Sequence, residues 1–169
     1  MKRVVIRTST PIAPFGEPAR ELRVLNKPLW LLQRDLLARH CQSTIEIESG
    51  EELPESNEEL LVHCDHHFFN APLMDTFIAE ARRSGRACQL AFALDDKAIT
   101  THALALQESI RKQDDVYVAD VFYYPHGPQE TPRPRRYGSS VRHRRGVGGE
   151  RGGDSRSRDR GAGTHLANR

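Results

Sequence analysis

Short apolar runs and amphipathic stretches alternate along the first 125 residues. Continuous apolar character at 4–6, 60–64 and 87–94 predicts three short strands that are buried on both faces. Strict alternation at 44–48 predicts a half-buried strand, and 116–124 is rich in β-branched and aromatic residues. These segments predict a sheet whose strands are separated by longer connections.

Helical periodicity fills two of those connections. Pro28 begins a pattern that runs through His40, and a second helix is expected from the N-cap Asn70 to about Ser84, ended by Gly85. A third helix is expected over 97–112. The first pattern places leucines on one side and polar side chains on the solvent side, the latter being Gln33, Arg34 and Arg39.

The element order is therefore β–α–β–β–α–β, followed by a helix and a strand. Such alternation predicts an α/β fold with a mostly parallel sheet covered by helices on both faces. Ligands of these sheets bind outside the carboxyl ends of the strands. That rule indicates the loop after Arg7 and the segment at Asp65.

Charge divides the chain near residue 130. Residues 1–130 hold 14 Lys and Arg against 20 Asp and Glu, a formal charge of −6, whereas 131–169 hold 11 Arg against 3 acids, or +8; the two add to the +2 of the chain. We expect an α/β domain over 1–126 and a disordered Arg/Gly-rich tail over 127–169, because the tail has too few apolar residues to form a core. The acidic body predicts no nucleic-acid partner except through the tail.

Three origins of the tail stay open at this point. It could bind RNA, it could be a solvated linker, or residues 131–169 could arise from a reading-frame change in GC-rich DNA, whose wrong frames are rich in Arg, Gly, Pro and Ala codons. Few aromatic residues interleave its arginines, which disfavours RNA binding. The frame change is the hypothesis that the composition favours.

Other features predict a cytoplasmic protein. No run approaches the 18 or so apolar residues needed to cross a bilayer, and Arg7 ends the first apolar run too early for a signal peptide. The three cysteines, Cys41, Cys64 and Cys88, have no CxxC pair and are expected to be reduced.

A sheet ending at Tyr124 would leave strand edges unpaired, so we expect a homo-oligomer or association with another chain.

Two segments combine a short sequence string with this order of elements. The first is PARELRVLNKPL over 18–29, which opens the first long helix; the second runs from ELLVHCD at 59–65 through FFN at 68–70 to SGRACQLA at 84–91. Together they resemble the amino-terminal part of the sugar-phosphate nucleotidyltransferase family. The resemblance implies a Rossmann-like domain that joins a nucleoside triphosphate and a sugar 1-phosphate, with Mg²⁺, into a nucleotide-sugar.

The resemblance also implies roles for particular residues. Asp65 would bind Mg²⁺, and Arg20 and Lys27 would contact phosphate as catalytic residues. The nucleotide would lie along the loop that follows the first strand, at Arg7, Thr8, Ser9 and Thr10. The family has a glycine-rich loop there, but this chain has no glycine before Gly16, and the second metal-binding Asp has no counterpart. We therefore expect weak or absent activity.

Other interpretations of the same residues stay open. Asp65 could cap the turn after its strand, and Lys27 could be an ordinary solvated residue. His63–Cys64–Asp65–His66–His67 contains zinc ligands, but neighbours on a strand point to opposite faces, so we expect no complete zinc site. The whole chain could be a non-catalytic binding module that kept the fold without the chemistry.

Overall fold

The computed structural model describes residues 1–8, 11–12, 16–104 and 109–136. Its main sheet is built from seven strands: β1 (Lys2–Arg7), β6 (Ser43–Glu48), β7 (Leu60–Cys64), β8 (Cys88–Ala93), β9 (Ile110–Gln113), β10 (Val116–Tyr124) and β11 (Arg133–Arg136). Its helices are α1 (Leu29–Leu37), α2 (Ala71–Ser84), the 3₁₀ turn η1 (Ala19–Glu21) and the π-helical turn η2 (Ile99–Ala103). Two small hairpins precede α1. One pairs β2 (Pro11–Ile12) with β3 (Glu17–Pro18), and the other pairs β4 (Arg23–Val24) with β5 (Lys27–Pro28).

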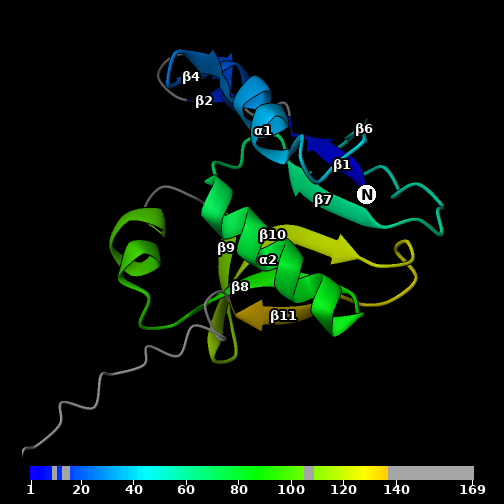
Figure 1. Cartoon of the computed structure of the whole chain (residues 1–169). Helices are drawn as coiled ribbons and strands as arrows, with labels where there is room; N and C mark the ends of the chain where they lie inside the picture. The colour runs from blue at the N-terminus through cyan, green and yellow to red at the C-terminus, as the bar shows by residue number, and fades with distance from the viewer. Residues whose placement is uncertain (9–10, 13–15, 105–108, 137–169) are drawn as a thin grey trace, which may run out of the picture.

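The fold is mixed α/β, and its central sheet is largely parallel. Its strand order is β11-β8-β10-β7-β1-β6, with β9 paired to β10 (Figure 1). Strand β1 lies parallel to both β6 and β7, and β11 lies parallel to β8. Strand β10 is antiparallel to β7, β8 and β9, so it runs against every strand beside it. The expected parallel sheet is thus interrupted by one reversed strand.

The best-predicted elements are β7 and α2. Every residue of β7 is buried, as its continuous apolar run requires. The Asn70 side chain accepts a hydrogen bond from the Leu73 amide, and Gly85 ends the helix at φ +64°. These local signals fix both ends of α2.

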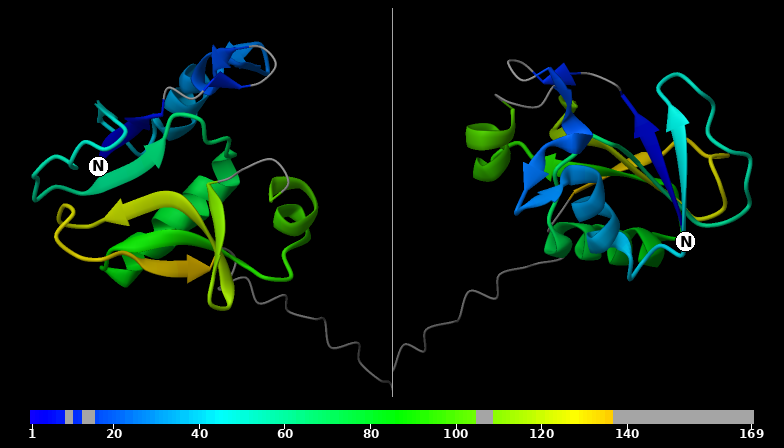
Figure 2. Two further views of the ribbon diagram at one scale, coloured as in Figure 1. Left: turned by 180° about the vertical axis from the view of Figure 1, so that it is seen from behind. Right: turned by 90° about the horizontal axis from the view of Figure 1, so that it is seen from above.

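Both long helices lie on one face of the sheet (Figure 2). They share a hydrophobic core in which Leu37 of α1 and Phe77 of α2 join Leu61, Leu90 and side chains of β10. The other face carries a smaller cluster, where Leu53 of the loop between β6 and β7 packs against a group containing Val4 and Val62. The expectation of helices on both faces is therefore wrong for these two helices.

Two further predictions need correction. Residues 97–112 do not form one helix: η2 covers Ile99–Ala103, and β9 begins at Ile110 because its backbone pairs with β10. The sheet also extends past the boundary expected at 126, since Arg133–Arg136 form β11 at its edge. Residues 137–169 lie outside the described residues.

Gly127 connects the loop after β10 to the body of the domain. Its amide donates to the Glu58 carbonyl at 3.0 Å, its φ is +75°, and a Cβ there would overlap the Ser56 carbonyl oxygen. Only glycine suits this position. In the described part of the chain no helix is both long and apolar enough to span a bilayer.

Candidate functional site

The carboxyl ends of β1 and β7 meet at Asp65. The Asp65 amide donates to the Ile6 carbonyl at 2.9 Å, which extends the β1–β7 pairing by one residue. The Asp65 Oδ1 atom accepts hydrogen bonds from the Thr8 amide at 3.2 Å and from the Thr8 hydroxyl at 2.8 Å. Asp65 is 3% exposed. The predicted metal ligand and the predicted nucleotide loop therefore lie at the same end of the sheet.

The predicted phosphate-binding cations have carboxylate partners within the chain. Arg20 forms two hydrogen bonds with Glu46, of 3.1 and 3.3 Å, and this pairing raises the pKa of Arg20 and lowers that of Glu46. Lys27 contacts Asp35 at 2.8 Å on the exposed surface. A ligand phosphate at either cation would compete with these internal pairs.

The remaining predicted nucleotide-binding residues are only partly described. Arg7 lies at the end of β1 and contacts Glu48 of β6 at 3.2 Å. Thr8 contacts Asp65, and its hydroxyl also lies 3.1 Å from His66 Nδ1. Ser9 and Thr10 lie outside the described residues.

Gln33 holds the Asp65 turn against α1. Its side-chain amide donates to the backbone carbonyls of Asp65, at 2.9 Å, and His67, at 2.7 Å. Its Oε1 accepts from Arg3 at 3.0 Å. Gln33 is 1% exposed, so its expected place on the solvent side of the helix is wrong. The polar side chain can be buried because its hydrogen bonds to Asp65, His67 and Arg3 satisfy it.

Arg3 and His63 continue this buried polar network. Arg3 Nε donates to His63 Nε2 at 2.9 Å, so His63 is neutral and its Nδ1–H donates to the Cys64 carbonyl at 2.8 Å. Burial, together with the charge of Arg3, holds the pKa of His63 well below its ordinary value. Burial lowers the pKa of Arg3 to about 10, which leaves it charged at neutral pH.

The side chains of the Cys/His cluster after β7 lie closer to one another than the alternation of a strand predicts. Ligand atoms of Cys64, His66 and His67 lie within 4.8 Å of one another, because the strand ends at Cys64 and the chain turns. However, His67 Nδ1 accepts the Cys64 amide at 3.3 Å, so the proton of this neutral ring is on Nε2. Burial also raises the pKa of the Cys64 thiol to about 11. Because the Cys64 amide already donates to His67 Nδ1, and the cluster offers three ligands among the described residues where a structural zinc site has four, it is not a complete zinc site.

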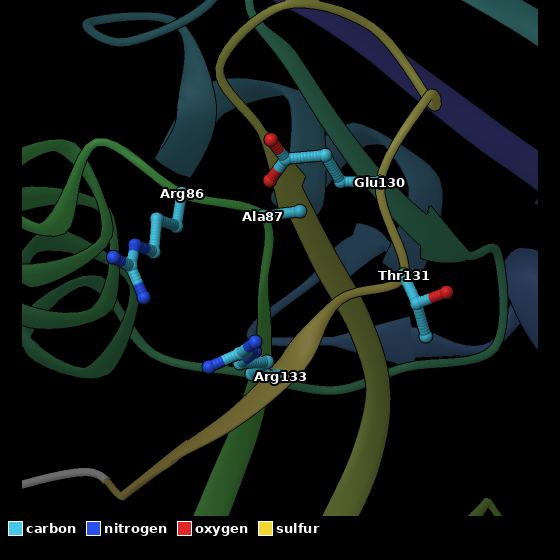
Figure 3. Close-up of a pocket in the computed structure, with 5 residues that line it drawn as sticks. All are labelled: Arg86, Ala87, Glu130, Thr131 and Arg133. Atoms are coloured by element: carbon cyan, nitrogen blue, oxygen red, sulfur yellow. The ribbon is translucent and has the colours of Figure 1, made fainter.

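Several hollows surround the sheet. An open one of about 580 Å³ lies between Arg86, Glu130 and Arg133, where β8 and β11 begin (Figure 3). Because β7 and β8 run in the same direction, this hollow is at the opposite end of the sheet from Asp65. A cavity of about 370 Å³ beside η2 is mostly apolar, with Phe69 and Leu90 among its lining. A cavity of about 170 Å³ touches Asp65 itself and is lined by Arg3, Arg20 and Glu46.

Sequence reasoning missed Arg3, Gln33 and Glu46 at this site. Arg3 could have been noticed as a charge next to a buried apolar run, but nothing in the helical pattern marks Gln33 as buried. No protein-family model matches the chain, and a search of curated proteins finds no match.

Proposed function

We propose that this chain is a nucleotidyltransferase-like protein with a Rossmann-like sheet. It binds a nucleoside triphosphate and Mg²⁺ where β1 and β7 end, and it joins the nucleotide to a sugar 1-phosphate slowly or not at all. The observation that carries the proposal is the contact between Thr8 and Asp65. It supports the idea because a nucleotide on the first loop would lie beside a carboxylate able to hold the metal at its phosphates.

Slow turnover has a separate physical basis. The loop after β1 has no glycine before Gly16 and contains prolines, which reduces the number of backbone amides available to a triphosphate. The internal pairs Arg20–Glu46 and Lys27–Asp35 neutralise the cations that would stabilise the leaving pyrophosphate. These pairs favour, as a second candidate, a non-catalytic module that binds nucleotide only.

The first experiment measures nucleotide binding. Thermal unfolding of the full chain is followed with ATP, CTP, GTP or UTP, each with and without Mg²⁺. We expect one or more nucleotides to stabilise the fold in the presence of Mg²⁺, by about 1.4 kcal/mol at tenfold excess over Kd. Asp65→Asn keeps an oxygen for Thr8 but weakens the metal ligand, so it should lose this stabilisation. Asp95→Asn, at an exposed position, is the matched control.

The second experiment measures turnover as pyrophosphate release after adding sugar 1-phosphates. We expect little or none. Stabilisation without pyrophosphate supports the binding module, and fast release that disappears in Asp65→Asn contradicts slow turnover. If no nucleotide stabilises the protein with Mg²⁺, the proposed function is wrong.

A further inference from the structure

Arg3 is a buried cation whose hydrogen bonds go to neutral groups. It is 4% exposed, and its guanidinium donates to the neutral His63 ring and to the Gln33 amide oxygen. Glu46 raises the pKa of Arg3 through its charge, but Glu46 itself is hydrogen-bonded to Arg20 and lies 3.8 Å from Arg7. Buried charges in proteins are normally paired. Arg3 therefore has an incomplete set of charge partners.

A groove of about 250 Å³ lies directly beside this cation. It runs between the end of α1, the loop that follows it and the start of β6, and its polar lining is Arg3, Arg34, Gln42, Ser43 and Thr44. The described residues that line it include no carboxylate. Cys41 also lines the groove, and burial raises the pKa of its thiol to about 11, so it adds no negative charge at neutral pH.

The groove and the proposed nucleotide site lie toward opposite ends of β1, although Arg3, Arg34 and Thr44 also line the cavity that touches Asp65. Arg3 pairs with Thr44, and Lys2 with Ser43, so the groove lies where the parallel strands β1 and β6 begin. Asp65 lies beyond their carboxyl ends. The carboxyl end of α1 contributes at most about half a negative charge here. The two positive charges of Arg3 and Arg34 exceed this half charge. The carboxylate that contacts Arg34, Asp35, is exposed and also contacts Lys27.

We propose that this groove binds a phosphate-like oxyanion, either free or as the monoester of a small molecule. The guanidiniums of Arg3 and Arg34 supply charge-assisted donors, and the Thr44 hydroxyl, on the same face of the sheet as Arg3, and the Gln42 side-chain amide supply neutral ones. The open groove leaves room for an ester group outside. This site does not depend on the proposed function, on Asp65 or on Mg²⁺.

The test is calorimetric titration of the full chain with inorganic phosphate, and separately with glycerol phosphate, at constant ionic strength and with EDTA. We expect saturable binding that Asp65→Asn retains. Arg34→Gln should weaken the affinity about tenfold, as expected for one charge-assisted hydrogen bond. The Arg34 side chain is 58% exposed, so its replacement should leave the fold intact. Arg83→Gln, at an exposed position of α2, is the matched control.

Each outcome is decisive. Binding of phosphate but not of its ester restricts the site to the free ion, and binding of both supports a monoester ligand. No saturable heat beyond that of a chloride reference overturns the proposal. Equal affinities of Arg34→Gln and Arg83→Gln overturn it as well, because binding would then be general attraction to surface charge. Arg3→Lys tests the buried cation: it keeps the charge but has fewer donors, so weaker binding by a folded variant supports the assignment and unchanged affinity contradicts it.

Discussion

Replacing Gln33 with leucine tests the buried polar network around Asp65. The substitution preserves the approximate volume and the helical propensity of α1, so its main effect is the loss of hydrogen bonds. Three partners lose their bond to Gln33: one Arg3 N–H and the carbonyls of Asp65 and His67. Each buried group left without a partner costs about 1–3 kcal/mol, and more for a charged one. Allowing for relaxation, we expect a loss of about 3–6 kcal/mol, a large part of the stability of a domain.

Urea denaturation at pH 7, followed by circular dichroism and by the fluorescence of Trp30, measures this loss as a change in the midpoint. Gln113→Leu, at an exposed position of β9, is the control and should change stability by less than about 0.5 kcal/mol. Gln33→Glu should lie between the two, because it offers Arg3 a carboxylate while losing both donors to the turn. If Gln33→Leu stays within about 1 kcal/mol of the wild type, the network does not contribute as described.

Three further predictions concern stability. Gly127→Ala should cost about 1–3 kcal/mol more than Gly50→Ala, since both have positive φ but only Gly127 faces a backbone oxygen; similar urea midpoints for the two variants would contradict this. Glu59→Gln should cost about 1 kcal/mol at pH 7, because Arg82 and Tyr123 hold the pKa of Glu59 below its ordinary 4.5. Because the pKa of Glu59 is lower in the folded state, its ionised form stabilises the fold above pH 4.5, and this stabilisation is lost as the pH falls through the pKa of the folded state. The stability curves of the wild type and Glu59→Gln should therefore converge in acid, and a constant gap between them would refute the pairing. A chain ending at Glu130 should be less stable than one ending at Arg136, because only the latter keeps β11 on β8; equal melting temperatures would argue against that strand.

The sequence predicted elements whose signals are local. The Asn70 cap and the Gly85 exit give α2 its bounds, and the apolar run 60–64 is β7. The position of Asp65 beside Thr8 was predicted from a general rule of parallel sheets, in which the carboxyl ends of neighbouring strands meet at one edge. The bounds of α2 and β7 required no knowledge of distant contacts.

The missed features depend on partners far away in the chain. The direction of β10 is decided by its position between β7 and β8, and periodicity carries no information on direction. Residues 110–113 have no apolar alternation, and they form a strand because β10 lies beside them. Gln33 looks solvent-exposed in its helix, and its burial follows from carbonyls 32 and 34 residues away. Tertiary contacts override pattern in each of these cases.

The reversed strand β10 also has a consequence for the order of folding. It joins β1, β6 and β7 on one side to β8 and β11 on the other, with residues of β10 and β7 that pair being 58 to 64 positions apart. Closing such long loops costs entropy before any contact compensates for it, which slows folding and makes it cooperative. The amides of β10 that pair with β7 should therefore be among the slowest to exchange with deuterium. The two parts of the sheet should lose protection together.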